Sequence, residues 1–274
     1  MTAQQHLDAG DLSAAIAQVS EDLRKSPTDT GKRTLLFELL CFAGDLDRAG
    51  RHLDVIAGES AEREAAVAPY RQLLEAEKQR RKVFAESLIP GLPKTIPDAV
   101  PLHLEAIRQV REKNYAEARD LLEQAAGKRK PLAGTINGEA FEDLSDADDL
   151  AGPFLEAIVN GNYAWLPWEA VDTVTIEPPK HLRDLIWIPA QVELQFGPLG
   201  EVFLPALYVD SYRSADQRVK LGRMTDWRQD VPDIAVAMGQ KLLTAGERDW
   251  PLLEVRTIEF AAREESDGVS GTAG

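Results

Sequence analysis

The chain has 274 residues, of which 44% are hydrophobic and 28% are charged, a composition typical of a globular protein and not of intrinsic disorder. Its formal net charge of −15 argues against nucleic acid and anionic membrane surfaces as partners, because like charges repel. The acidity serves either solubility alone or the attraction of a basic partner segment, and the sequence leaves both open.

Cys41 is the single cysteine, which excludes an intrachain disulfide and a zinc site built from cysteines. The N-terminus lacks the basic and apolar regions of a signal peptide. No window approaches the roughly 18 consecutive apolar residues of a membrane-spanning helix. We therefore expect a cytoplasmic protein that binds neither membranes nor nucleic acid.

The N-terminal half predicts helical repeats. The pair Gly10-Asp11 recurs 34 residues later as Gly44-Asp45, which is the period of tetratricopeptide repeats. Both pairs are followed by apolar residues at the spacing of an amphipathic helix. In such a repeat the glycine lies in the turn between two helices, so two helix pairs are expected before residue 60.

Residues 60–87 then predict one long helix, in which Pro69 marks a kink. We interpret its basic run as a solvated face rather than a nucleic-acid site: Lys78, Arg80, Arg81 and Lys82. A linker rich in Pro and Gly follows over residues 86–101. A third helix pair is expected over residues 102–125, with Lys113-Asn114 at its turn.

These patterns divide the chain into parts. Residues 1–130 form a tetratricopeptide-like helical repeat domain, an α-solenoid whose concave face either receives a peptide or helix or only supports the second domain. Residues 131–262 form an α+β domain rich in strands, and residues 263–274 a disordered tail. The fold class is thus α+β multidomain.

The second domain begins with turn and helix signals. Asn137-Gly138 between β-prone runs predicts a type I′ hairpin. We interpret a following acidic group as the N-cap and first turn of a helix over residues 152–161, in preference to a metal site: Asp143, Asp146, Asp148 and Asp149.

Strands are predicted after this helix, over residues 163–168, 171–176, 185–194, 201–209 and 252–260. Pro167, Pro189 and Pro205 interrupt three of these runs, as in edge strands, bulges or a strongly bent, barrel-like sheet.

Aromatic residues cluster in this domain, where they either fill its core or build a binding surface. We take six residues as a candidate interaction or structural surface: Tyr163, Trp165, Trp168, Trp187, Arg223 and Trp227. The motifs containing Arg183-Asp184 and Arg223 with Asp226 are interpreted either as structural ion pairs or as anchors for a substrate anion.

Catalytic motifs are missing from the sequence. The four histidines, His6, His52, His103 and His181, are scattered without ligand spacing, so no metal site is predicted. There is no nucleophile elbow, phosphate-binding loop or dinucleotide-binding turn, so we predict no catalytic residue and no cofactor. The alternative is an enzyme of unknown reaction with a site near Arg183, Asp184, Arg223 and Asp226.

Four segments together carry a family resemblance: DADDLAGPFLEAIVNGNYAWLPW, PPKHLRDLIWIPAQVEL, FLPALYV and LGRMTDW. With them the chain resembles the ImpE family, also called TagJ, which comprises accessory proteins of bacterial type VI secretion. The resemblance covers nearly the whole chain. It implies an N-terminal tetratricopeptide-like domain followed by an α+β domain with a barrel-like sheet.

The resemblance also implies a function. Members of the family are cytoplasmic, non-enzymatic accessories of the contractile sheath. The implied partner is the N-terminal helix of the small sheath subunit, bound as a helix in a groove, and the implied role is help in sheath assembly or in recycling by an AAA+ ATPase. The family supplies no catalytic residue to transfer to this chain.

Overall fold

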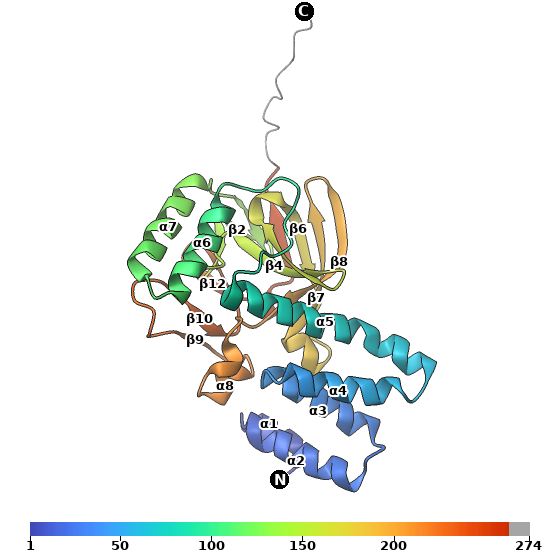
Figure 1. Ribbon diagram of the computed structural model, residues 1–274. Coiled ribbons are helices and arrows are strands. Elements are labelled where there is room, and N and C mark those ends of the chain that lie inside the picture. The colour runs from blue at the N-terminus through green and yellow to red at the C-terminus, as the bar shows by residue number, and fades with distance from the viewer. Residues whose placement is uncertain (263–274) are drawn as a thin grey trace, which may run out of the picture.

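The computed structural model describes residues 1–262, with helices in the first half and strands in the second (Figure 1). The helices are α1 (Ala3–Asp8), α2 (Leu12–Lys25), α3 (Thr30–Phe42), α4 (Leu46–Ala57), α5 (Ala61–Glu86), α6 (Ala99–Arg111), α7 (Tyr115–Lys128) and α8 (Gln217–Lys220). The strands are β1 (Gly134–Ile136), β2 (Glu139–Phe141), β3 (Leu144–Asp146), β4 (Phe154–Val159), β5 (Asn162–Pro167), β6 (Val171–Ile176), β7 (Trp187–Leu194), β8 (Gly197–Pro205), β9 (Thr225–Trp227), β10 (Ala237–Gly239), β11 (Leu242–Ala245), β12 (Arg248–Pro251) and β13 (Thr257–Phe260). Short 3₁₀ helices are η1 (Trp168–Ala170), η2 (Leu182–Leu185), η3 (Ser211–Arg213) and η4 (Leu252–Glu254). The α+β class is confirmed, whereas the tail predicted to be disordered, residues 263–274, lies outside the described residues.

The repeated Gly-Asp pairs end one helix and begin the next. Gly10 and Gly44 have φ angles of +76° and +77°, in the left-handed region that glycine adopts without strain. Asp11 and Asp45 then accept hydrogen bonds from backbone N–H groups in the first turns of α2 and α4. The two helix–turn–helix pairs predicted before residue 60 are therefore confirmed.

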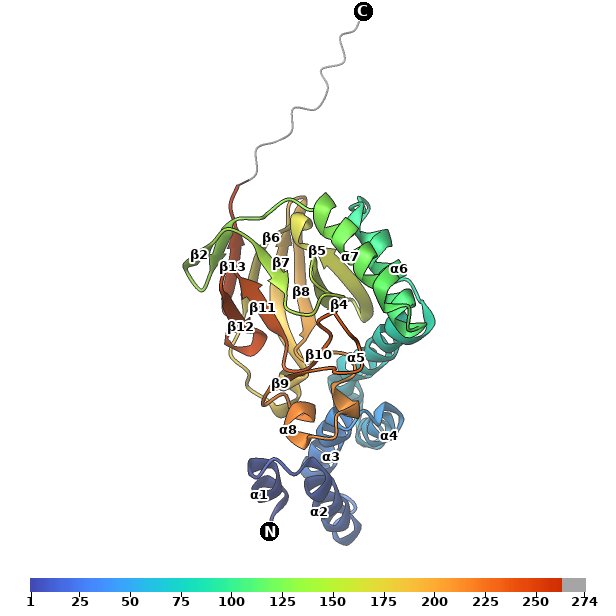
Figure 2. The same ribbon diagram turned by 90° about the vertical axis from the view of Figure 1, so that its left-hand side faces the viewer.

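The α6–α7 pair packs against the sheet. The long helix predicted over residues 60–87 is α5, with Pro69 inside it, and the third pair is α6 and α7. Figures 1 and 2 show α6 and α7 beside the sheet, while α5 runs between α1–α4 and the sheet. Val110 and Ala118 of this pair share a core with Phe154 and Trp165 of the sheet. Within residues 1–262, no helix has the length and apolar character to cross a membrane.

The main sheet has the strand order β2-β1-β13-β6-β7-β8-β4-β5. Its first hairpin turns at Asn137 and Gly138, whose φ angles of +50° and +81° confirm the predicted type I′ turn. Register shifts between Val171 and Thr173 and between Val192 and Glu193 bend the sheet. It remains open, with β2 and β5 at its ends, so the barrel-like shape expected from the sequence is not confirmed.

A smaller sheet, β12-β11-β3, covers part of the main sheet. Leu243 and Trp250 of the small sheet pack in one core with Val174 and Ile188 of the large one. A third core joins α1–α5 to the β-rich region and includes Trp187 and Leu207. The helical and β-rich parts of the chain are therefore held together by buried apolar contacts.

The helix predicted over residues 152–161 is wrong, because this segment is strand β4 and its turn into β5. Residues 154–158 are all buried, so the strand shows none of the alternation that identifies a half-exposed strand. Asn160 and Gly161 have positive φ angles, as in a tight hairpin, and this turn signal resembles a helix C-cap in the sequence.

Candidate functional site

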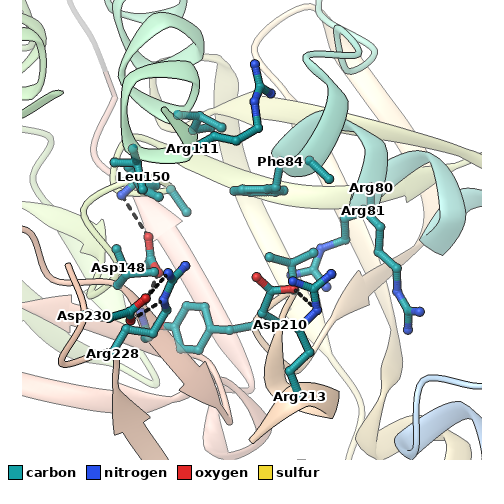
Figure 3. A pocket seen from close by; sticks show the side chains of 18 of the residues that line it. Arg80, Arg81, Phe84, Arg111, Asp148, Leu150, Asp210, Arg213, Arg228 and Asp230 are labelled. Atoms are coloured by element: carbon teal, nitrogen blue, oxygen red, sulfur yellow. Dashed lines mark hydrogen bonds and ion pairs between the residues drawn. The ribbon is translucent and has the colours of Figure 1, made fainter. Parts of the chain in front are cut away.

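A cavity of about 320 Å³ lies where α5, the α6–α7 pair and the β-rich region meet (Figure 3). Phe84 of α5 and Ile107 and Val110 of α6 give it an apolar wall on the helical side. Leu150, in the connection between β3 and β4, and Val236, before β10, continue that wall. The cavity thus presents a surface suited to an apolar side chain.

The cavity also carries charge, contributed by both its helical and its β-rich sides. The lining residues with ionisable side chains are Arg80, Arg81, Arg111, Lys113, Arg213, Arg228, Asp148, Glu156, Asp210 and Asp230, together with Tyr115, Tyr208 and Tyr212. Cationic side chains outnumber carboxylates in this set, in a chain whose net charge is −15. The cavity is therefore a locally cationic site on an acidic protein.

Arg213 and Arg228 approach the cavity beside their own carboxylates (Figure 3). The Nη2 atom of Arg228 lies 2.8 Å from Oδ2 of Asp230, and Nε of Arg213 lies 3.4 Å from Oδ1 of Asp210. The hydrogen bond from Arg228 lowers the pKa of Asp230, and the nearby charge of Lys113 adds to this effect. These side chains therefore form one charged group at the cavity.

Lys113 reaches this group because of the turn between α6 and α7. Its φ angle is +65°, and its N–H donates to the carbonyl of Val110, which closes α6. Among the residues that the structure describes, neither Lys113 nor Arg111 has an ion-pair partner. Arg111 donates instead to the hydroxyl of Ser87, at 2.7 Å.

A buried ionic network lies under the cavity. Arg80 binds Glu156 of β4 in bidentate fashion, with Nε···Oε1 and Nη2···Oε2 distances of 2.7 and 3.0 Å. Lys241 lies 2.7 Å from Glu156 and 2.5 Å from Asp146. All four side chains are buried. The prediction that Arg80 belongs to a solvated face is wrong, because α5 turns this arginine toward a carboxylate contributed by a strand distant in sequence.

Two buried carboxylates of the cavity lining, Glu156 and Asp148, have pKa values shifted in opposite directions. Burial alone would raise the pKa of Glu156, but the charges of Arg80 and Lys241 outweigh burial and hold it well below its usual range. Burial raises the pKa of Asp148 to about 7, and the neighbouring Asp146 carboxylate adds to the increase. The cavity wall therefore contains a carboxyl group that titrates near neutral pH.

The acidic group expected at a helix N-cap has other roles. Asp148 accepts hydrogen bonds from the N–H groups of Leu150 and Ala237, at 2.8 and 2.7 Å. Asp149 accepts from the N–H of Ala235, and Asp143 pairs with Arg129. The N-cap prediction is wrong because no helix follows this group, and its carboxylates instead tie the β3–β4 connection to neighbouring segments.

The cavity combines an apolar wall with charged side chains. In the described chain, no Ser, Thr, Cys or His is among the cavity-lining residues. Over residues 1–262, no group of three or more His, Cys, Asp or Glu side chains is arranged to hold a metal ion. The apolar wall and the guanidinium groups together suit a ligand with an apolar body and an anionic end.

The six residues predicted as an interaction or structural surface lie elsewhere, and none of them lines this cavity. Four of them are buried: Tyr163, Trp165, Trp168 and Trp187. Trp165 stacks on Phe154 with a centroid distance of 4.6 Å. Trp227 is half-buried in β9, and exposed Arg223 donates to the carbonyl of Asp8 at the end of α1.

The four residues considered for an enzyme do not share a cavity. Arg183 lies 2.9 Å from the Glu38 carboxylate of α3, and the Asp184 carboxylate accepts the N–H groups that precede η2. These two residues line a separate cavity of about 210 Å³ that includes neither Arg223 nor Asp226. Asp226 accepts a hydrogen bond from the N–H of Trp227. The structure thus brings together only Arg183 and Asp184.

Sequence reasoning missed Arg213, Arg228 and the tyrosines of the cavity. The sequence contains two partial indications of this site. Lys113 lies in a predicted turn, and Arg228 directly follows the LGRMTDW motif. Their convergence depends on the packing of α6 against the β-rich region, which periodicity does not report.

Comparisons with known proteins extend over most of the chain. The family model described as "ImpE protein" matches residues 138–259. A Pseudomonas aeruginosa protein named "Type VI secretion system accessory component TagJ" is 34% identical over 260 residues, which cover 95% of this chain and 91% of that protein. The crystal structure of protein VPA1032 from Vibrio parahaemolyticus is similar with a TM-score of 0.87 and 25% identity, over 95% of this chain and 98% of that one.

Proposed function

The chain belongs to the ImpE family, and from this premise we propose that it is a non-enzymatic accessory component of a type VI secretion system. In this proposal the protein acts in the cytoplasm as an adaptor. It binds the N-terminal helix of the small sheath subunit and assists sheath assembly or recycling by the AAA+ ATPase.

The observation that carries the proposal is the cavity between α5, the α6–α7 pair and the β-rich region. Amphipathic helices are bound by apolar clefts with charged rims, where a few side chains of the helix act as anchors. Phe84 and Val110 supply the apolar wall, and Arg228 contributes to the rim. The apolar wall and the charged rim together suit the binding of an amphipathic helix.

The turns of the helical repeats are less suited to a partner, because the C-terminal half covers them. Tyr212 lies directly over Gly44, and Arg218 lies over Gly10. The N–H of Ser13 in α2 donates to the side chain of Gln217 in α8, at 2.7 Å. We therefore place the binding site at the cavity and not at the repeat turns.

Isothermal titration calorimetry tests this function. The purified protein is titrated with the intact small sheath subunit and, as a matched control, with the same subunit lacking its N-terminal helix. We expect binding to the intact subunit and loss of binding to the truncated one. Equal binding of both forms would exclude the helix as the recognised element, and no binding of either form would contradict the adaptor function.

A further inference from the structure

We infer that the cavity recognises an acidic amphipathic helix, by enclosing one apolar side chain against Phe84 and Val110 and binding one carboxylate at Arg213 and Arg228. This inference rests on the proposed function and deepens it, since it states the chemistry that the partner helix must carry.

The size of the cavity limits what can enter it. At about 320 Å³ it lies at the lower end of the range for small-ligand pockets, so it holds one or two side chains and not a whole helix. A partner helix therefore lies across the mouth and inserts the residues of one turn. Residues three or four positions apart lie on the same face of a helix, which allows an apolar anchor and a carboxylate to enter together.

The charge of the mouth selects the sign of the partner. At the mouth, Lys113, Arg213 and Arg228 lie with Asp210 and Asp230, so these five side chains carry one excess positive charge. The lining residues Arg80 and Arg81 are paired with Glu156 and Glu77 instead. Arg111 does not contribute to this balance, since Figure 3 shows it extending away from Arg213 and Arg228. A single excess positive charge matches one carboxylate.

The existing ion pairs do not prevent such binding. The Arg213 side chain is 63% exposed and the Asp230 side chain 69% exposed, so water already competes for both pairs. Exposed pairs of this kind contribute little free energy. A carboxylate that enters beside the apolar wall displaces water and gains charge-assisted hydrogen bonds from the guanidinium groups.

Charge reversal tests the inference with a matched control. Arg228→Glu and, separately, Arg213→Glu place a negative charge at the cavity. Arg248→Glu causes the same change of net charge on β12, where Arg248 pairs with exposed Glu139 at 2.6 Å and does not line the cavity. Each folded variant, verified by circular dichroism and thermal unfolding, is titrated with the intact small sheath subunit in the calorimeter.

We expect Arg228→Glu and Arg213→Glu to weaken binding by roughly 30-fold or more, and Arg248→Glu by less than about threefold. A sheath subunit in which one acidic residue of the N-terminal helix is replaced by Lys should bind Arg228→Glu more tightly than the unmodified subunit does. Restoration by one such replacement would identify the carboxylate that enters the cavity.

The outcomes separate this inference from the proposed function. If the wild-type protein binds the helix and all three variants bind equally well, the inference is overturned while the adaptor function stands. If the wild-type protein does not bind the sheath subunit, both fail. A parallel titration with inorganic phosphate covers a free anion: phosphate binding that Arg228→Glu abolishes, with helix binding unchanged, would also overturn the inference.

Discussion

Arg80 and Glu156 connect the two halves of the chain through a buried bidentate ion pair. Arg80 lies in α5 and Glu156 in β4, and Lys241 and Tyr163 also contact the Glu156 carboxylate. Burying such charges is costly, so the intact network adds little net stability, whereas breaking one of its ion pairs is strongly destabilising. Removal of Arg80 leaves the Glu156 carboxylate buried with one cationic partner fewer.

Arg80→Met therefore should lower the free energy of unfolding by about 3 kcal/mol or more, because Glu156 stays buried with only Lys241 as a cationic partner. Urea denaturation measures this change. Arg71→Met is the matched control, since Arg71 pairs with exposed Asp54 and Glu64, and its loss should cost less than about 1 kcal/mol. Equal costs for the two variants would show that the buried pair does not hold the halves together.

Asp148 gives the protein a measurable pH dependence. Its pKa is raised from 3.8 to about 7, so the folded state binds a proton that the unfolded state has already released above about pH 4. Stability from this group is present at low pH and is lost as the pH rises through 7, by about 2 kcal/mol between pH 5 and 8. Glu156 has the opposite pH dependence. Because its pKa is lowered in the folded state, its contribution to stability is present above the pKa of the unfolded chain and is lost as the pH falls.

Asp148→Asn removes this titration. The free energy of unfolding, measured in urea at pH 5 and pH 8, should decrease with pH by about 2 kcal/mol more in the wild-type protein than in the variant. Other titrating groups, such as buried His103 with its pKa lowered to about 4, are common to both proteins and cancel in the comparison. Identical pH profiles would contradict a raised pKa at Asp148.

At the scale of elements, the turn between α3 and α4 supports the cavity. A Cβ atom at Gly44 would lie 2.3 Å from Cδ2 of Tyr212, and the same tyrosine ring lies 4.1 Å beneath the Arg81 guanidinium. Tyr212 lines the cavity and precedes Arg213. The repeat turn, α5 and the segment after β8 are thus packed as one unit.

Gly44→Ala should therefore destabilise the protein by more than the cost of placing an alanine at a positive φ angle. Left-handed backbone costs an alanine about 1 kcal/mol, and the displacement of Tyr212 adds to that cost. Gly138→Ala is the control, because its φ is +81° and nothing lies within 4 Å of the added Cβ. Unfolding in urea should show the larger loss for Gly44→Ala, and a loss equal to that of the control would contradict the close packing.

The elements that the sequence predicts best are those with a clear period or turn. The Gly-Asp repeat predicts the helices α1 to α4, and Asn137-Gly138 predicts the first hairpin. Strand β4 was mistaken for a helix because both of its faces are buried, so its pattern lacks a period of two. The Asp148 carboxylate is misinterpreted for a different reason, because one of its hydrogen-bond donors, the N–H of Ala237, is almost ninety residues away in the sequence.

At the scale of the whole molecule, the candidate site exists only because three parts of the chain converge. Phe84, Lys113 and Arg228 come from α5, the α6–α7 turn and the segment after β9, and each is unremarkable in its own sequence context. Single-sequence patterns report which face of an element is apolar, but not which elements meet. The family resemblance pointed to the class of protein, whereas the position of the cavity required the structure.

Site-specific crosslinking in secreting cells tests whether the partner helix binds at the cavity. A photo-crosslinking amino acid replaces Lys113 at the cavity or Val55, which is 48% exposed on α4 of the solenoid. We predict that position 113 captures the small sheath subunit and that position 55 does not. Capture at position 55 with none at position 113 would move the binding site to the helical repeats and contradict the account.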